Sequence, residues 1–236
     1  EYYTKTDSSF NRINIWSILN GVGHRNRKNG TEWYLSGMFE QVIPFGIGGY
    51  RHKLPGYFNK EFKNDYLLET KGFIDYGFNN KDVKGKLGVG LTYFPKKFIR
   101  TFIEFGDFYD HINDFASIEQ AFSRSNYIRT KSASISQRME IVNGLFGELT
   151  FEYSDQQPIN NIELANWSNN LFGHLNSPTD FERYTKSEVK LELKYRIQQK
   201  YILKGNKKII IGTKHPELTF VYRKGISGLF NSEVNF

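Results

Sequence analysis

The stretch TKSEVKLELKYRI, residues 185–197, alternates between charged side chains and uncharged, mostly apolar ones. One face would carry Val189, Leu191, Leu193, Tyr195 and Ile197, and the other Lys186, Glu188, Lys190, Glu192, Lys194 and Arg196. A helix places residues three and four apart on one face, so this period of two fits an extended strand. The stretch therefore predicts a β-strand with one apolar and one charged face.

The same alternation returns along most of the chain. It is clear in KGKLGVGLTY (84–93), which indicates a strand at 85–94, and in LFGELTFEYS (145–154). Further strands are expected at 12–22, 32–42, 66–78, 98–107, 126–140, 208–223 with a break at Pro216, and 229–236. A short helix over 161–172 is the one expected exception. The pattern predicts an all-β fold, an antiparallel meander of about ten long strands, in a single domain spanning residues 1–236.

Strand length and the rhythm of the connections favour a membrane barrel. Segments of about 10 to 15 residues match a tilted membrane-spanning strand better than a globular strand of roughly 5 or 6. The connections are short at 95–97, 142–144 and 204–206, and long at 108–125 and 156–183. Short periplasmic turns and long outer loops are typical of outer-membrane barrels, so we predict that the short turns share the periplasmic end. A soluble sandwich or lipocalin-like barrel stays open, because alternation does not show which face is wet.

Composition excludes several classes of protein. The 236 residues include 32 Lys and Arg against 25 Asp and Glu, a net charge of +7. There is no run of roughly 18 apolar residues, which excludes a helical membrane span. Without cysteine, the chain cannot form a disulfide framework, a thiolate zinc site or a cysteine nucleophile. Basic residues are interleaved with Glu along the strands, which argues against a nucleic-acid partner.

Two groups of residues are candidate metal ligands. GDFYDHINDF, residues 106–115, places Asp107, Asp110, His111 and Asp114 in one connection. Their oxygen atoms suit Ca²⁺, but the glycine turn and the bidentate Glu of a calcium-binding loop are missing, and turn-forming Asp and Asn explain the same residues. The five histidines, His24, His52, His111, His174 and His215, show neither an HExxH motif nor an i, i+4 pair.

Catalytic and cofactor motifs are also absent. Ser123 and Ser125 flank Arg124 without a nucleophile-elbow pattern, although a histidine and an acid could still meet across a barrel rim. Gly46, Gly48 and Gly49, in PFGIGGY, miss the dinucleotide fingerprint and favour close packing or a bend in a strand. The sequence therefore predicts no catalytic, metal-binding or cofactor-binding residue.

Six strings of this sequence resemble a family of outer-membrane proteins from the Gram-negative Bacteroidetes. They are IGGYRHKLPGYFNKEF (47–62), IDYGFNNKDVKGKLGVGLTYFPKKF (74–98), GDFYDHIND (106–114), FSRSNYIRTK (122–131), RMEIVNGLF (138–146) and KGNKKIIIG (204–212). In that family a carboxypeptidase-like regulatory domain precedes a large C-terminal β-barrel of unknown function. The resemblance runs from about residue 10 to the end of the chain.

The resemblance implies that the chain is an internal slice of a longer barrel. Such a slice would have two unpaired edges and an open wall. The family is broadly similar to surface-antigen barrels that insert or export outer-membrane proteins. Their lid motif of Arg, Gly and an aromatic residue is not matched, because four residues separate Arg51 from Gly56 and Tyr57. The lid role is therefore not carried over.

These observations lead to two functional hypotheses. The first is a non-enzymatic outer-membrane β-barrel that acts in transport, assembly or the anchoring of partner proteins. Its expected partners are outer-membrane lipid and lipopolysaccharide, together with periplasmic or surface proteins. The second is a soluble β-rich module that binds glycans or proteins. Peptidase activity is not expected, because the zinc ligands of a carboxypeptidase are missing.

Overall fold

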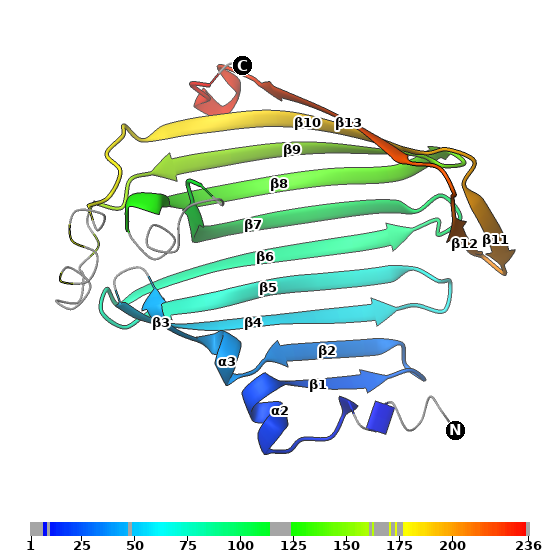
Figure 1. Cartoon of the computed structure of the whole chain (residues 1–236), viewed down its shortest axis with the longest axis horizontal. Coiled ribbons are helices and arrows are strands. Elements are labelled where there is room, and N and C mark those ends of the chain that lie inside the picture. Colours follow the sequence, from blue (N-terminus) through cyan, green and yellow to red (C-terminus); the bar gives the residue numbers. More distant parts are fainter. Residues whose placement is uncertain are drawn as a thin grey trace.

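The computed structural model describes residues 7–8, 10–46, 49–113, 124–160, 162, 170, 173 and 177–234. Within them the chain forms one large antiparallel sheet and a separate two-stranded hairpin (Figure 1). Ten strands lie in the order β1-β2-β4-β5-β6-β7-β8-β9-β10-β13, and β3 pairs with β4 as an eleventh strand. The prediction of an all-β antiparallel meander is confirmed.

The strands differ in length between the two margins and the middle of the sheet. They are β1 (Gly21–Asn26), β2 (Thr31–Ser36), β3 (Val42–Gly46), β4 (Gly49–Glu61), β5 (Leu67–Gly77), β6 (Asp82–Tyr93), β7 (Ile99–His111), β8 (Tyr127–Val142), β9 (Leu145–Gln157), β10 (Tyr184–Arg196) and β13 (Glu217–Gly225). The separate hairpin consists of β11 (Lys200–Lys204) and β12 (Lys207–Gly212). Short helical segments are α2 (Ile15–Asn20), α3 (Met38–Gln41), η1 (Arg124–Asn126) and η3 (Leu229–Asn231).

The N-terminal part differs from the prediction. The strand expected at 12–22 is mostly helix α2, and β1 begins only at Gly21. Asn14 explains the helix, because its side chain accepts a hydrogen bond from Ser17 N (2.9 Å) while Ser17 Oγ accepts one from Asn14 N (2.8 Å). This capping box offers the backbone a local alternative to a strand ladder. The strand expected at 32–42 likewise ends at Ser36 and is followed by α3.

The C-terminal part also departs from the prediction. The strand expected at 208–223 is two strands in different sheets, since β12 pairs with β11 and β13 pairs with β10. The strand expected at 229–236 is replaced by the 3₁₀ turn η3, where Gly228 and Phe230 have φ values of 79° and 51°. These left-handed conformations interrupt an extended chain. The helix expected over 161–172 falls largely outside the described residues.

Strand β4 was not predicted, although it pairs with β5 along its whole length from Arg51 to Glu61. Pro55 lies in its middle, and proline in a run normally argues against a central strand. The other edge of β4 is shared by two partners, with β3 pairing up to His52 and β2 pairing from Gly56. Pro55 lies in the gap between them. Its missing N–H group therefore removes no hydrogen bond to a neighbouring strand on that edge.

The pairing register gives the sheet two chemically different faces. The charged face consists of Arg51, Lys53, Glu69, Lys71, Asp75, Lys84, Lys86, Arg100, Glu104, Arg138, Glu148, Glu152, Glu188, Lys190, Glu192, Lys194 and Arg223. The apolar face consists of Leu54, Phe58, Ile74, Leu87, Val89, Leu91, Ile103, Phe105, Ile135, Leu149, Phe151, Val189, Leu191, Leu193, Leu218, Phe220 and Tyr222. The two-faced strand predicted at 185–197 is therefore confirmed and extends across the sheet.

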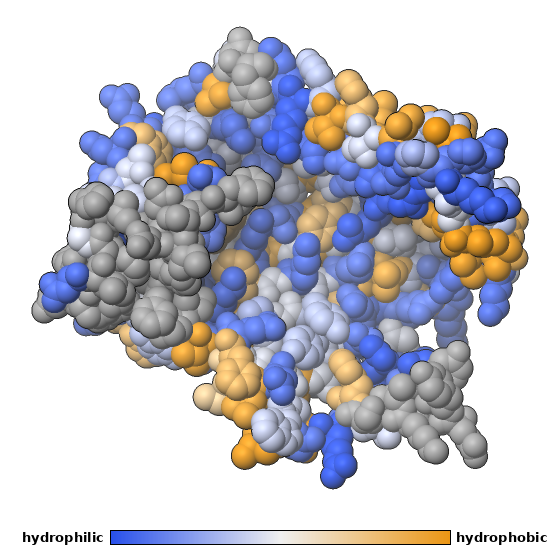
Figure 2. All heavy atoms as spheres, viewed as in Figure 1, coloured by the Kyte–Doolittle hydropathy of each residue, from blue (hydrophilic) through white to orange (hydrophobic). Residues whose placement is uncertain are grey.

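Exposure is inverted relative to a water-soluble protein. On the apolar face, Ile74, Leu149 and Phe220 are 63%, 52% and 57% exposed, whereas Arg51 and Lys84 on the charged face are 3% and 6% exposed. Figure 2 shows hydrophilic side chains across the hollowed middle of the molecule and hydrophobic ones along its margins, over β13 and the β11–β12 hairpin. The most buried charged side chains of the sheet are therefore far less exposed to solvent than its apolar side chains.

Successive strands from β4 to β10 are antiparallel neighbours, so their connections alternate between two ends of the sheet. The turn end has the connections 27–30, 62–66, 94–98, 143–144 and 197–216; the loop end has 37–48, 78–81, 112–126 and 158–183. The prediction that the short turns share one end is confirmed (Figure 1). Within the described residues β1 and β13 are open edges, so the sheet is not closed, as predicted.

None of the helices in the described part of the chain is both long enough and apolar enough to cross a bilayer.

Candidate functional site

The charged face has its most buried ion pairs near the loop end, around Arg51. Its Nε atom lies 2.9 Å from Asp75 Oδ1 on β5, and its Nη1 atom lies 2.9 Å from Asp82 Oδ1 on β6. Tyr109 on β7 donates a hydrogen bond to the other oxygen of Asp82 (2.8 Å), and its ring lies under the guanidinium of Arg51. Gly77 makes room for this arrangement, because a Cβ atom there would lie 2.3 Å from Arg51 Nη1.

A second group extends the cluster toward β8. Asp107 accepts hydrogen bonds from Nε and Nη2 of Arg129, at 2.8 and 2.6 Å, and lies 3.2 Å from Lys84 Nζ. A polar cavity of 250 Å³ lies beside these residues, lined by Asp82, Lys84, Tyr109 and Arg129 among others. Three basic and three acidic side chains, counting Arg51 and Asp75, thus neutralise one another. The arrangement pairs charges in a partly desolvated place and supplies neither a nucleophile nor a poised base.

Ion pairs continue along the charged face toward β10. Lys86 and Glu104 lie 2.6 Å apart, Arg100 and Glu69 lie 2.9 Å apart, and Lys190 and Glu192 lie 3.0 Å apart. Phe102 covers Gly88 and Gly90 on the same face, where a Cβ atom at Gly88 would lie 2.5 Å from its ring. The face is thus a mixed-charge surface with aromatic rings interspersed. Such a surface suits contact with water or polar solutes rather than with hydrocarbon.

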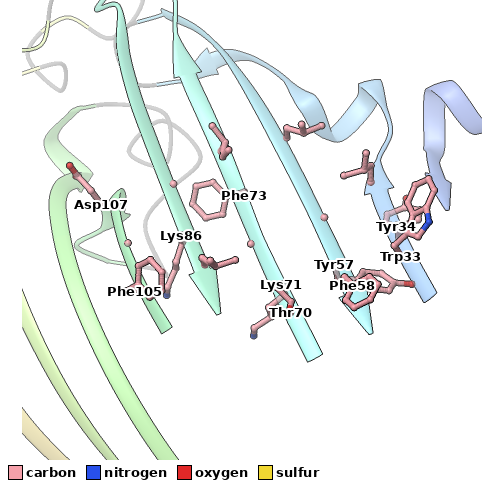
Figure 3. Close-up of a pocket in the computed structure, with 18 of the residues that line it drawn as sticks. Trp33, Tyr34, Tyr57, Phe58, Thr70, Lys71, Phe73, Lys86, Phe105 and Asp107 are labelled. Carbon is pink, nitrogen blue, oxygen red and sulfur yellow. The ribbon is translucent and has the colours of Figure 1, made fainter. Parts of the chain in front are cut away.

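The apolar face has a long groove of 960 Å³ across β2, β4, β5, β6 and β7 (Figure 3). Its floor lacks side chains at Gly56, Gly72 and Gly85, and these glycines are required, because a Cβ atom at Gly72 would lie 2.4 Å from the Lys86 carbonyl oxygen. Its walls are mostly apolar, formed by Trp33, Leu35, Leu54, Phe58, Ile74, Leu87 and Phe105. The groove is therefore shaped for hydrocarbon.

The β11–β12 hairpin is fastened to the turn end by two adjacent lysines. Lys207 contacts Glu61 and lies 3.3 Å from Asp65 in the β4–β5 turn. The hydrogen bond to the Glu61 carboxylate raises the pKa of Lys207 above its usual value. Lys208 pairs with Glu140 and reaches Asn143 Oδ1 (2.9 Å) at the β8–β9 turn. The hairpin thus connects two turns that lie four strands apart in the sheet.

The acidic connection singled out as a candidate calcium site is divided in the structure. Asp107 is in the ion-pair cluster, Asp110 is exposed and accepts a hydrogen bond from His111 N (3.0 Å), and Asp114 lies outside the described residues. The His111 ring packs against Tyr127, with centroids 4.4 Å apart. Among the residues that the structure describes, no three His, Asp or Glu side chains gather where they could hold a metal ion.

The remaining histidines are found on separate elements. His24 stacks on Trp33, with centroids 6.4 Å apart, His52 Nδ1 lies 3.1 Å from Tyr50 OH, and His215 Nε2 lies 3.0 Å from Gln198 Oε1. His174 lies outside the described residues. The structure thus brings no two of the four described histidines into one site.

The serine and glycine motifs take structural places. The Ser125 carbonyl oxygen accepts a hydrogen bond from Thr179 Oγ1 (2.6 Å), while Ser123 and Gly48 lie outside the described residues. Gly46 pairs with Gly49, whose φ of 108° suits glycine, where β3 turns into β4. Gly46 and Gly49 thus lie at the facing ends of two antiparallel strands and do not bend a single strand as expected.

A comparison with protein families adds one finding. A family model described as "Family of unknown function (DUF5686) C-terminal domain" matches residues 16–236. The chain belongs to this family. No curated protein and no solved structure shows significant similarity to this chain. The resemblance found in the sequence is thus confirmed at the level of a family of unknown function with an antiparallel β-sheet.

Two features of the DUF5686 domain were missed in the sequence. The buried pair of Lys208 and Glu140 joins residues 68 positions apart, and nothing in either local sequence indicates it. The lysines of the short turns were visible, but only the strand order shows that they share one end of the sheet. Basic residues are interleaved with acidic ones along the strands, as the sequence indicated, but the turns contain mostly basic residues.

Proposed function

We propose that the DUF5686 domain is a non-enzymatic wall segment of a β-barrel in the outer membrane, with its apolar face toward lipid and its charged face toward the lumen. One observation carries the proposal: large apolar side chains are exposed across one face while charged side chains of the other face are shielded. In water this arrangement is unfavourable, because burying apolar surface is the main favourable term in folding. In a bilayer the same arrangement is the expected one.

Strand geometry supports the proposal. Strands β4 to β10 have 11 to 16 residues each, and a tilted span needs about 9 to 11. Near the loop end the positions of the apolar face become polar, where Asp107, Lys131 and Asp155 are paired across β7, β8 and β9. A bounded apolar band with polar margins is typical of a membrane barrel.

The proposal assigns partners to each surface. Lipid and lipopolysaccharide acyl chains cover the apolar face, and the glycine-floored groove of Figure 3 accommodates one of these chains. The charged lumen and the long loops face solutes or protein partners, which gives the domain a role in transport, assembly or anchoring. No step of this role requires a reaction.

Fractionation of cells that produce the full-length protein tests the proposal. We expect the protein in the outer-membrane fraction, resistant to salt and carbonate and extracted by detergent. A soluble periplasmic marker and a known outer-membrane porin are the controls. Recovery of the protein in the soluble periplasm without detergent would overturn the proposal and favour the alternative, a soluble module that binds glycans or proteins.

A further inference from the structure

The turn end of the sheet is strongly basic. Its five connections contain ten basic residues, Arg27, Lys28, Lys63, Lys96, Lys97, Lys200, Lys204, Lys207, Lys208 and Lys214, against one acidic residue, Asp65. The described connections of the loop end contain three basic residues, Lys81, Arg124 and Arg183, against three acidic residues, Glu40, Asp180 and Glu182. Charge is therefore distributed unequally between the two ends.

Most of this basic charge is available to a partner. Within the described part of the chain, seven exposed lysines of the turn end form no ion pair: Lys28, Lys63, Lys96, Lys97, Lys200, Lys204 and Lys214. They belong to connections between successive strands, so they are spread along the rim of the sheet rather than around one pocket (Figure 1). An extended anionic surface matches this distribution better than a small ligand does.

The β11–β12 hairpin adds exposed apolar side chains at the same end. Ile202, Leu203, Ile209 and Ile211 are 50%, 60%, 42% and 64% exposed, and hydrophobic atoms gather over this hairpin in Figure 2. A two-stranded hairpin is marginally stable by itself. The contacts of Lys207 with Glu61 and of Lys208 with Glu140 hold it in place. The fold thus presents apolar side chains among unpaired lysines.

We propose that the turn end lies against the headgroup layer of an anionic phospholipid bilayer, with the hairpin's apolar side chains inserted between headgroups and the unpaired lysines beside phosphates. Apolar burial combined with lysines near anionic lipid is the combination that holds interfacial segments to membranes. An acidic protein would match the lysines alone, whereas a bilayer interface matches both features. The inference rests on the proposed function, which places this rim at the level of one leaflet.

The absence of cysteine from the chain allows a site-specific test. The full-length protein with Ile211→Cys, in which any cysteine outside this chain is replaced by serine, is labelled with an environment-sensitive fluorophore and reconstituted in nanodiscs of phosphatidylcholine, with or without phosphatidylglycerol. We expect phosphatidylglycerol to lower quenching of the label by neutral acrylamide about twofold. A label at Asp180→Cys, at the loop end, should not respond. Lys200→Gln with Lys204→Gln should abolish the response, while the matched double variant Lys81→Gln with Lys131→Gln should retain it.

The outcomes distinguish this inference from the proposed function. If the protein inserts and the Ile211 label is quenched equally in both lipids, the inference is overturned while the barrel stands. If the protein does not insert, the proposed function fails, and sedimentation with phosphatidylglycerol vesicles decides the inference. Vesicle binding that is lost in the Lys200 and Lys204 double variant would support it, and no binding would overturn it.

Discussion

Lys208 and Glu140 form an ion pair across 68 positions of sequence, and their side chains are 7% and 1% exposed. Glu140 also accepts hydrogen bonds from Gly144 N (3.0 Å) and Gln199 Nε2 (2.9 Å). One carboxylate therefore joins the β8–β9 turn, the end of β10 and the separate hairpin. Without Lys208, the buried carboxylate of Glu140 would keep its two hydrogen bonds but lose its counter-charge.

Removal of that lysine should be costly. We expect Lys208→Met to lower the free energy of unfolding by about 3–5 kcal/mol, because it leaves a buried carboxylate without its counter-charge. Urea unfolding of the refolded protein, followed by tryptophan fluorescence, measures the change.

Lys204→Met, in the same hairpin but exposed and without an ion pair among the described residues, should be nearly silent. The double variant Glu140→Gln with Lys208→Met should lose less than the sum of the single variants. Equal stability of the two lysine variants would contradict the assignment.

The faces of β10 can be tested at neighbouring positions. Leu191 is paired with Leu149 and Tyr222 on the apolar face, while Lys190 lies on the charged face. If the apolar face contacts lipid, Leu191→Arg should destabilise the barrel by about 2–4 kcal/mol near the midplane. Lys190→Ala should have almost no effect. Unfolding in lipid vesicles compares them, and equal tolerance at both positions would rule out the membrane assignment.

The cluster around Arg51 predicts a difference between two arginines. Arg51→Met leaves Asp75 and Asp82 without their partner in a place where the arginine side chain is 3% exposed, and we expect a loss of about 3–5 kcal/mol. Arg183 likewise donates hydrogen bonds from Nε and Nη2 to the Asp155 carboxylate, both at 2.8 Å, but its side chain is 64% exposed. Arg183→Met should therefore lower the melting temperature far less. A similar shift for both variants would show that Arg51 is not effectively buried.

Topology in the cell is a separate prediction. An epitope tag at Ser168, in the connection 158–183 of the loop end, should be accessible to antibody on intact cells. A tag at Gly144, in the β8–β9 turn, should be reached only after the outer membrane is permeabilised. The opposite pattern would invert the orientation. Accessibility of both tags would mean that no membrane separates the two ends.

The sequence was sufficient for the long middle strands and insufficient for the margins of the sheet. Alternation at 185–197 and 145–154 predicts β10 and β9 because one side chain in two is apolar, and no local interaction competes with that pattern. At Asn14 and Ser17 a two-residue capping box outweighs a weak strand signal. In β4 the pattern is obscured by Pro55, which is tolerated only because β2 and β3 leave a gap opposite it.

The candidate surfaces were harder to predict because they depend on strand order. Three of the four short turns carry one or two basic residues, which is unremarkable by itself, and the basic rim appears only when the turns are brought to one end. The acidic connection at Asp107 shows the converse. The spacing of its acidic residues suggested a shared metal site, yet the Asp107 carboxylate forms ion pairs with Lys84 and Arg129.

The two open edges of the sheet constrain how such a wall can reach a bilayer. Along β1 and β13 the outward backbone groups lack strand partners within the described residues. Each unpaired N–H or C=O group costs several kcal/mol in hydrocarbon, so the open sheet cannot enter the lipid first and acquire neighbours afterwards. Strand pairing and insertion must then proceed together. In the proposed barrel, the order of assembly would thereby be set by backbone hydrogen bonding, independently of the side chains on the apolar face.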